Sequence, residues 1–380
     1  MPTLFDPLTL GDLTLPNRIL MAPLTRGRAT REAVPTAIMA EYYAQRAAAG
    51  LIISEATGIS REGLGWPFAP GLWTDDQVEG WKPVVAAVHE AGGRIVAQLW
   101  HMGRLVNPGV SGIRPVSASA TTGPGLDHTY DGKQPSVEAR AASVEDIARI
   151  LGDYASAARN AVAAGFDGVQ IHGANGYLID QFLRDGTNLR DDDYGGPIAN
   201  RLRFLREVVG AVIAEIGVAR TGIRLSPNGD VQGCHDSDGH ALFTAAAAEL
   251  EALGVPWIEL REPGPQSSFR ATEEPPVSPA IRAVYSGRIV LNSDFDSASG
   301  QAKLDEGICD AISFGRPFLA NPDLVERIRL GAKFNAPDVP TLYSQGSKGY
   351  TDYPSLPSRH DERLGQNPGA IKPGAEQEPA

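Results

Sequence analysis

Short runs of apolar and β-branched residues alternate along the chain with longer segments whose apolar residues recur at helical spacing. Eight of the short runs predict strands, at residues 18–22, 50–55, 94–99, 168–172, 221–226, 256–260, 288–292 and 310–314. The segments between them predict helices at residues 36–49, 75–91, 143–164, 198–216, 238–253, 276–285, 297–306 and 321–330. Eight strands, each followed by a helix, favour an α/β fold with a single (β/α)8 TIM barrel, because an open doubly wound sheet usually has fewer strands and a GxGxxG fingerprint, which this chain lacks.

Four further segments lie outside this alternation. Residues 4–15 predict a β-hairpin that caps the barrel floor, and residues 101–142 and 261–275 are long insertions. Both insertions leave the carboxyl ends of strands, where barrel active sites form, so we expect them to shape the site. Residues 358–380 are rich in Pro, Gly, Glu and Gln and predict a disordered tail, which leaves residues 1–357 as one domain.

Composition narrows the class of protein. The chain of 380 residues has a formal net charge of −12 and no block of Lys or Arg, which argues against a nucleic-acid partner. No apolar run approaches the roughly 20 residues that cross a bilayer. The first residues lack the pattern of a signal peptide, so we expect a cytoplasmic protein. Two cysteines, Cys234 and Cys309, are too few for a disulfide framework or a cysteine metal site.

The most informative segment follows the fourth predicted strand, which ends at His172. Asn175 and Tyr177 come three and five residues later, so a tight turn would aim an imidazole, an amide and a phenol into one cavity. Two neutral donors can hold a carbonyl oxygen, and a phenol with an ordinary pKa of about 10 can donate a proton while remaining neutral at rest. The alternative is that the three groups cap the strand and the next helix.

Two predicted strands carry polar side chains that would point into the barrel. Gln98 and Trp100 share a face, because strand side chains alternate, and a heterocycle with donor and acceptor edges would satisfy the buried amide. Arg224 lies among apolar neighbours and must meet an anion or a carboxylate. The carboxylate alternatives are Glu55 and Glu259.

The loops after the first two and the last two predicted strands suit a flat, phosphorylated ligand. Small residues after the first two strands would let a flat ring lie across the barrel mouth. Ser293 follows the seventh strand, and Gly315 and Arg316 follow the eighth, where barrels commonly bind phosphate. On the residues alone, the chain is therefore a flavin-binding or phosphate-binding barrel.

Five motifs in order resemble the Old Yellow Enzyme family of flavin-dependent ene-reductases, over residues 3–354. They are Asn17-Arg18-Ile19 with Ala22-Pro23-Leu24-Thr25-Arg26, Gln98-Leu99-Trp100-His101-Met102-Gly103-Arg104, His172-Gly173-Ala174-Asn175-Gly176-Tyr177-Leu178, Gln181-Phe182-Leu183, and Phe314-Gly315-Arg316-Pro317. The resemblance implies noncovalent FMN, NADPH or NADH as reductant and no metal. Thr25 indicates the classical branch of this family, because the thermophilic-like branch usually has Cys at this position.

The resemblance also implies roles for single residues. The flavin ring would be lined by Pro23, Leu24, Thr25 and Ala56. Its pyrimidine edge would be bound by Gln98 and Arg224, and His172 would lie beside the ring. Ser293, Gly315 and Arg316 would hold the phosphate. His172 and Asn175 would bind the substrate oxygen, and Tyr177 would donate the proton. Trp66, where relatives often have Tyr, Trp100 and Tyr350 would contact substrate.

The implied reaction has two half-reactions in one site. NAD(P)H would reduce FMN, and an enone, enal, nitroalkene or maleimide would then take a hydride from flavin N5 at its β-carbon and a proton at its α-carbon. The expected partners are these small molecules, with no nucleic acid and no membrane, and the protein would be a monomer or a homodimer. Two alternatives are a barrel lyase or isomerase acting on a phosphorylated substrate, and a flavin- or steroid-binding protein without catalysis.

Overall fold

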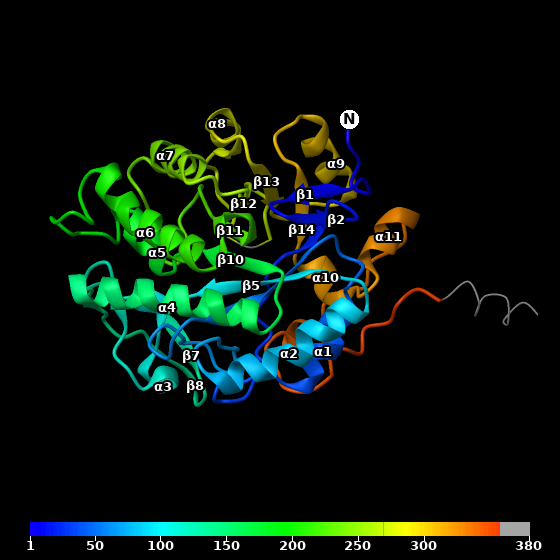
Figure 1. The fold of residues 1–380 in the computed structure, drawn as a ribbon, viewed down its shortest axis with the longest axis horizontal. Helices are drawn as coiled ribbons and strands as arrows, with labels where there is room; N and C mark the ends of the chain where they lie inside the picture. The colour runs from blue at the N-terminus through cyan, green and yellow to red at the C-terminus, as the bar shows by residue number, and fades with distance from the viewer. Residues whose placement is uncertain (269, 358–380) are drawn as a thin grey trace, which may run out of the picture.

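A closed barrel of eight parallel strands forms the centre of the structure, a computed structural model that describes residues 1–268 and 270–357 (Figure 1). In barrel order the strands are β3 (Ile19–Met21), β4 (Ile52–Gly58), β5 (Ile95–Trp100), β10 (Gly168–His172), β11 (Thr221–Leu225), β12 (Trp257–Arg261), β13 (Arg288–Asn292) and β14 (Ala311–Phe314). Each predicted strand is found in its place, with ends that differ by up to three residues. The predicted (β/α)8 barrel is confirmed.

Helices surround the barrel, one or more after each strand (Figure 1). Those that match the predicted segments are α1 (Ala37–Ala44), α2 (Asp75–Glu90), α4 (Val144–Ala163), α6 (Ile198–Ile216), α7 (Gly239–Ala252), α8 (Ser278–Val284), α9 (Ser297–Asp305) and α11 (Leu324–Leu330). A capping box formed by Ser143 and Asp146 is present at the start of α4. The predicted helix at 36–49 ends early, because the chain passes into turns after Ala44.

Several short elements were not predicted. They are α5 (Leu178–Leu183), α10 (Arg316–Ala320) and the single turns η1 (Gly103–Leu105), η2 (Val218–Arg220) and η3 (Val339–Thr341). All six residues of α5 are buried, so this helix has no polar face and its sequence shows no helical periodicity.

The predicted hairpin closes the amino-terminal end of the barrel. β1 (Leu8–Leu10) pairs antiparallel with β2 (Leu13–Leu15). The hairpin leucines pack in one apolar cluster with interior barrel residues, among them Leu20 and Val290. At the turn, Gly11 has φ +59°, and a Cβ there would lie 1.9 Å from the carbonyl oxygen of Ala219. A larger residue would therefore push the hairpin off the barrel.

The two insertions lie at the opposite, carboxyl-terminal end. The first contains α3 (Pro108–Ser111), the strand pair β6 (Val116–Ser117) and β9 (Arg140–Ala141), and the antiparallel pair β7 (Leu126–Thr129) and β8 (Gly132–Pro135). In Figure 1 this group lies on the lower side of the barrel, away from β1 and β2. The second insertion follows β12, and its described residues form turns and bends.

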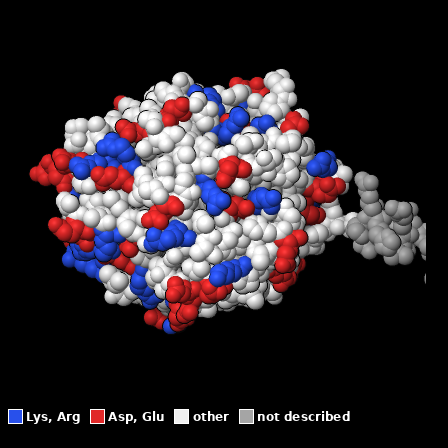
Figure 2. All heavy atoms as spheres, viewed as in Figure 1, with Lys and Arg blue, Asp and Glu red and all other residues white. Residues whose placement is uncertain are grey.

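Acidic and basic side chains are interspersed over the face shown in Figure 2, without a large area of one sign. Within the two described ranges, no helix combines the length and the apolar character that crossing a membrane requires. The disordered tail predicted at residues 358–380 lies outside the described residues.

Candidate functional site

A cavity of about 580 Å³ opens at the carboxyl ends of the strands, and this volume suits a small-molecule or cofactor site. Nearly all of the predicted site residues line it: Pro23, Leu24, Thr25, Ala56, Trp66, Gln98, Trp100, His172, Asn175, Tyr177, Arg224, Ser293, Gly315 and Arg316. These residues come from loops and strand ends far apart in the sequence, so the barrel assembles one site from them. Tyr350 is the exception.

His172 ends β10 with its ring buried on the cavity wall. The backbone N–H of Ala174 donates to its Nδ1 at 3.4 Å, which assigns the imidazole proton to Nε2. Burial, and secondarily the charge of Arg224, hold the pKa of His172 well below its usual value. The ring is therefore a neutral hydrogen-bond donor at physiological pH.

Asn175 lies in a tight turn and has the left-handed backbone conformation, φ +60°, which Asn tolerates better than most residues. Its backbone N–H donates to Ser226 Oγ at 2.8 Å, and the N–H of Gly176 donates to Asp180 Oδ2 at 2.8 Å. The side-chain Oδ1 of Asn175 is buried and has no hydrogen-bond partner among the described residues. The turn is thus fixed through its backbone, and the amide remains available to a ligand.

A buried ion pair supports this turn from behind. Arg184 Nε lies 2.9 Å from Asp180 Oδ1, and both side chains are almost completely buried. Arg184 also donates to the carbonyl of Ser226 at 2.6 Å. Sequence analysis missed Asp180 and Arg184, although their i, i+4 spacing after the site motif was a possible signal.

Tyr177 packs against two other aromatic groups of the cavity wall. Its ring meets those of Trp100 and His172 edge to face, with centroids 5.0 and 4.9 Å away. Burial, together with the neighbouring Tyr343, raises the pKa of the Tyr177 phenol. The phenol therefore keeps its proton at neutral pH and can donate it.

A polar network forms the floor of the cavity. Arg224 Nη1 lies 2.6 Å from Glu259 Oε1, so the ion pair that was the alternative to a ligand contact exists, with Glu259 and not Glu55 as the partner. Gln98 donates to Gln170 at 2.7 Å, and Gln170 donates to Glu259 at 2.8 Å. Arg224 Nε is buried without a hydrogen-bond partner among the described residues. A heterocycle that supplies an acceptor would satisfy this donor, and the pyrimidine edge of a flavin carries such acceptors.

Glu55, unlike Glu259, does not pair with Arg224 and instead binds the loop that carries Thr25. Its carboxylate accepts from the backbone N–H groups of Arg26 and Gly27 at 3.2 and 3.3 Å. Burial raises the pKa of Glu55, although these two hydrogen bonds act in the opposite direction. The contacts fix the chain immediately after Thr25, and so define the wall that the flavin ring would contact.

The predicted phosphate end lies beside β13 and β14. The hydroxyl groups of Ser293 and Ser267 are 3.3 Å apart, and Arg316 lines the same region. A Cβ added at Gly315 would meet a single neighbour within 4 Å, Leu24 Cδ2 at 3.5 Å. The backbone at Gly315 is therefore open to the cavity, which fits close approach of a phosphate.

The prediction that Tyr350 contacts substrate is wrong. Tyr350 is completely buried and stacks on Tyr42 with centroids 4.1 Å apart, and the guanidinium of Arg28 lies 4.5 Å from the ring centroid. These cation–π and stacking contacts draw the ring into the interior. Tyr343, earlier in the same segment, lines the cavity instead and packs 5.0 Å from Trp66.

The two tryptophans of the cavity differ in burial, and this difference predicts different effects of substitution. Trp100 is 1 % exposed, whereas Trp66 is half-buried between His128 and Tyr343. We expect Trp100→Ala to lower the free energy of unfolding by about 3–5 kcal/mol. Trp66→Ala should cost about 1 kcal/mol and change the ratio of product enantiomers, because it enlarges the mouth. Urea unfolding measures the stability of the two variants, and chiral chromatography measures the enantiomer ratio of the product. Equal stability losses in the two variants would contradict the assignment of Trp100 to the core and of Trp66 to the mouth.

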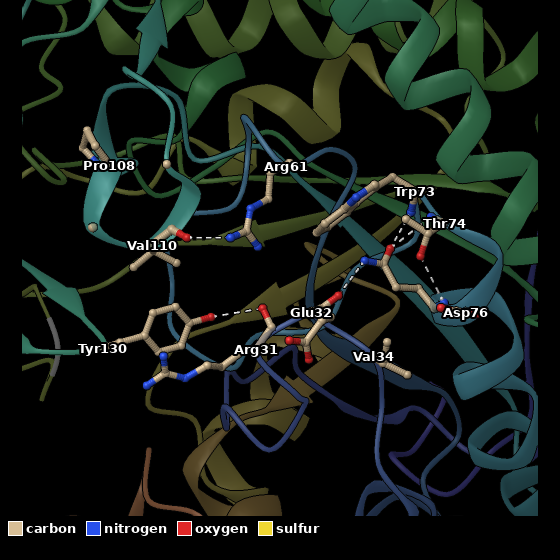
Figure 3. Close-up of a pocket in the computed structure, with 13 residues that line it drawn as sticks. Arg31, Glu32, Val34, Arg61, Trp73, Thr74, Asp76, Pro108, Val110 and Tyr130 are labelled. Carbon is tan, nitrogen blue, oxygen red and sulfur yellow. Dashed lines mark hydrogen bonds between the residues drawn. The ribbon is translucent and has the colours of Figure 1, made fainter.

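A second pocket, of about 640 Å³, lies between the loops after β3 and β4, the start of α2, and α3 (Figure 3). Its polar groups bond to one another: Arg61 donates to the carbonyl of Val110, and the hydroxyl of Tyr130 to that of Arg31. None of the predicted site residues lines it. These hydrogen bonds connect the loops, whereas the predicted site residues line the first cavity.

Fold and site together define a flavin-dependent barrel oxidoreductase. The chain belongs to the NADH:flavin oxidoreductase / NADH oxidase family, whose sequence model matches residues 3–335. An Old Yellow Enzyme homologue from Zymomonas mobilis is 58% identical, with a TM-score of 0.93, and the match covers 93% of this chain and 100% of that one. Morphinone reductase, solved in complex with tetrahydroNAD, is 45% identical, with a TM-score of 0.89, over 95% and 99% of the two chains. 12-Oxophytodienoate reductase 2 of Arabidopsis thaliana is 40% identical, over 93% of this chain and 96% of its own length.

This membership decides among the three interpretations of the sequence. The protein is an NAD(P)H-dependent flavin oxidoreductase with FMN as cofactor, as the resemblance implied. It is therefore neither a lyase or isomerase nor a binding protein without catalysis.

Proposed function

We propose that the enzyme is an ene-reductase, which reduces the C=C bond of an enone, enal, nitroalkene or maleimide. The observation that carries this proposal is the meeting of two neutral hydrogen-bond donors, His172 and Asn175, with the protonated phenol of Tyr177 on one wall of a cavity whose floor fits FMN. NAD(P)H and the alkene would use this cavity in turn, which predicts ping-pong kinetics.

The residues that would hold the cofactor fall into two groups. All of them line the cavity. Those that would surround the ring are Pro23, Leu24, Thr25, Ala56, Gln98, His172 and Arg224, and those that would bind the phosphate are Ser293, Gly315 and Arg316. When bound and reduced, FMN supplies a hydride to the electrophilic carbon of the substrate. The protein's part is to place and polarise the alkene, and to deliver the proton.

His172 and Asn175 would act on the oxygen of the substrate carbonyl or nitro group. Nε2–H of His172 and the amide of Asn175 donate to this oxygen, which withdraws electrons from the β-carbon. Negative charge grows on the oxygen as the enolate or nitronate forms, so the two hydrogen bonds strengthen toward the transition state. Because β10 and the turn after it already position the backbone of both residues, little reorganisation is needed.

Tyr177 would then supply a proton to the α-carbon. Its hydroxyl is protonated at rest, because burial raises its pKa, and its ring position is set by Trp100 and His172. A hydride at the β-carbon and a proton at the α-carbon complete the saturated product, and solvent returns the proton to the phenolate.

The test is anaerobic stopped-flow reoxidation of the NADPH-reduced holoenzyme by 2-cyclohexenone, nitrostyrene and N-methylmaleimide. We expect saturable reoxidation with each acceptor. When the reaction is run in D₂O, the product should carry one deuterium from solvent at the α-carbon. Reoxidation no faster than in acceptor-free buffer would refute the proposal. Saturated cyclohexanone, which has the same oxygen but no C=C bond, is the matched control substrate.

A further inference from the structure

The Gln181-Phe182-Leu183 motif has no role in the proposed function, although it follows Tyr177 by only four residues. It lies in α5, directly after the turn that carries Asn175 and Tyr177. The side chain of Gln181 is completely buried. It bonds to the backbone of two segments that form the cavity wall, and so lies behind that wall.

The amide of Gln181 uses its full hydrogen-bonding capacity, with two donated and two accepted bonds. Nε2 donates to the carbonyl of Gly176 at 2.8 Å and to the carbonyl of Met102 at 3.0 Å. Oε1 accepts from the backbone N–H of Arg104 at 3.0 Å and from the hydroxyl of Ser117 at 2.8 Å. Three of the four partners are backbone groups, so the amide fixes the course of the chain rather than a neighbouring side chain.

The bond to Gly176 acts directly on the position of Tyr177. The carbonyl oxygen of Gly176 belongs to the planar peptide unit that also contains the Cα of Tyr177. A hydrogen bond to this oxygen therefore orients the plane from which the phenol side chain extends. Gly176 also donates its N–H to Asp180 Oδ2 at 2.8 Å, and a Cβ at Gly176 would lie 2.7 Å from the carbonyl oxygen of Val231. Side chains of α5 thus hold both polar backbone groups of the residue before Tyr177.

The bonds to Met102 and Arg104 fix the loop that follows Trp100. They engage the two peptide units that flank Gly103, which has φ +62°. A Cβ at Gly103 would lie 2.0 Å from Gln181 Oε1, so glycine is required for this close approach of the loop to the amide. The amide therefore connects the loop after Trp100 to the turn before Tyr177. The rings of these two residues meet in the cavity with centroids 5.0 Å apart.

We propose that Gln181 is a positioning residue for proton transfer, whose amide sets where the hydroxyl of Tyr177 lies relative to the substrate. The inference rests on the proposed function, in which Tyr177 is the general acid. The two residues that bind the substrate oxygen are anchored separately, because His172 belongs to β10 and Asn175 donates its backbone N–H to Ser226 Oγ. Loss of the Gln181 amide should therefore impair delivery of the proton more than binding of the substrate oxygen.

The experiment replaces the amide by an apolar thioether of similar length, Gln181→Met, in the holoenzyme with FMN bound. Gln77→Met is the matched control, because Gln77 is also buried and its amide also bonds to backbone groups, at Trp73 and Glu32. Gln77 lies in the first turn of α2, outside the cavity. Anaerobic stopped-flow reoxidation of the NADPH-reduced enzymes by 2-cyclohexenone and by nitrostyrene gives a limiting rate and an apparent Kd for each acceptor.

We expect Gln181→Met to lower the limiting rate with 2-cyclohexenone by about 10- to 100-fold, the size of effect that a small misplacement of a reacting group produces. The apparent Kd for cyclohexenone should change by less than about 3-fold, and so should the limiting rate with nitrostyrene, which accepts the hydride without needing the proton at once. In a Tyr177→Phe background, Gln181→Met should cause little further loss with cyclohexenone, because the hydroxyl that it positions is already absent. Gln77→Met should leave both rates at their native values, even where it lowers the melting temperature as much as Gln181→Met does.

The proposal is overturned if Gln181→Met keeps the native rate with cyclohexenone or slows both acceptors equally, since the amide would then have no specific effect on proton transfer. It is also overturned if the loss is as large in the Tyr177→Phe background as in the native one. Should Gln181→Met not fold, Gln181→Asn decides, because its shorter amide reaches only one of the two segments. It should show the same selective loss with cyclohexenone, and a native ratio of the two rates would contradict the proposal.

The native enzyme separates these outcomes from a failure of the proposed function. If cyclohexenone does not reoxidise the native enzyme faster than acceptor-free buffer does, the proposed function is refuted, and this inference with it. If cyclohexenone does reoxidise the native enzyme, the outcomes for the Gln181 variants bear on this inference alone.

Discussion

Tyr177→Phe should slow reoxidation of the reduced enzyme by 2-cyclohexenone by about 10²- to 10⁴-fold, the usual contribution of a general acid. The substitution removes only a hydroxyl from a ring that Trp100 and His172 hold in place. An enone requires the α-proton to complete its reduction. A nitroalkene should be affected less, because hydride transfer alone gives a nitronate that water can protonate later. Stopped-flow absorbance with both acceptors measures the two rates.

Tyr343→Phe is the matched control for this prediction, since Tyr343 also lines the cavity and loses the same hydroxyl. We expect it to reduce cyclohexenone within a few-fold of the native rate. Reduction by NAD(P)H should be nearly unchanged in both variants, and phenols should still bind to Tyr177→Phe because His172 and Asn175 remain. A Tyr177→Phe enzyme with nearly native cyclohexenone reduction would show that water is the acid.

The barrel was predictable because the burial of each strand is visible in its local sequence. A strand buried on both faces is a short continuous apolar run, and the chain repeats this pattern eight times between amphipathic helices. The site followed from the same topology, since parallel strands bring their carboxyl ends together. His172, Arg224 and Gly315 could thus be assigned to one cavity before any contact was known.

What the sequence left open depended on contacts between distant segments. Tyr350 was assigned to the site from its motif, but its side-chain direction is decided by stacking on Tyr42 and by the guanidinium of Arg28, more than 300 residues away. Likewise, Arg224 had two candidate partners, and only the register of β11 with β12 places it beside Glu259. No local pattern distinguishes such alternatives.

Arg261 shows the same limit in a residue that lines the cavity. In the sequence it opens the insertion at residues 261–275, where it is indistinguishable from a loop arginine. Strand pairing with β13 extends β12 by this residue and turns the side chain into the barrel. The predicted strand ended one residue earlier, at residue 260, and this one-residue difference decides whether Arg261 is taken for a loop residue or for a residue that lines the cavity.

Replacing both His172 and Asn175 by Ala should reduce the rate of alkene reduction by about 10³-fold or more, because each preorganised donor to a developing oxyanion contributes about 10²- to 10³-fold. Reduction by NAD(P)H, which develops no such oxygen charge, should fall much less. Phenol binding, followed by the charge-transfer absorbance of the oxidised enzyme, should weaken in parallel with alkene reduction. Because burial and Arg224 keep His172 neutral, the native rate should also show no histidine ionisation between about pH 6 and 8.

His172→Asn is the control that separates hydrogen bonding from packing, since an amide restores a neutral N–H donor at the end of β10. It should recover alkene reduction to within about 10-fold of the native rate, as expected for one intact and one longer hydrogen bond. Equal losses in the two half-reactions of the double variant would instead indicate a displaced cofactor. In that case His172 and Asn175 would serve mainly to shape the cavity wall, and polarisation of the substrate would have to come from elsewhere in the site.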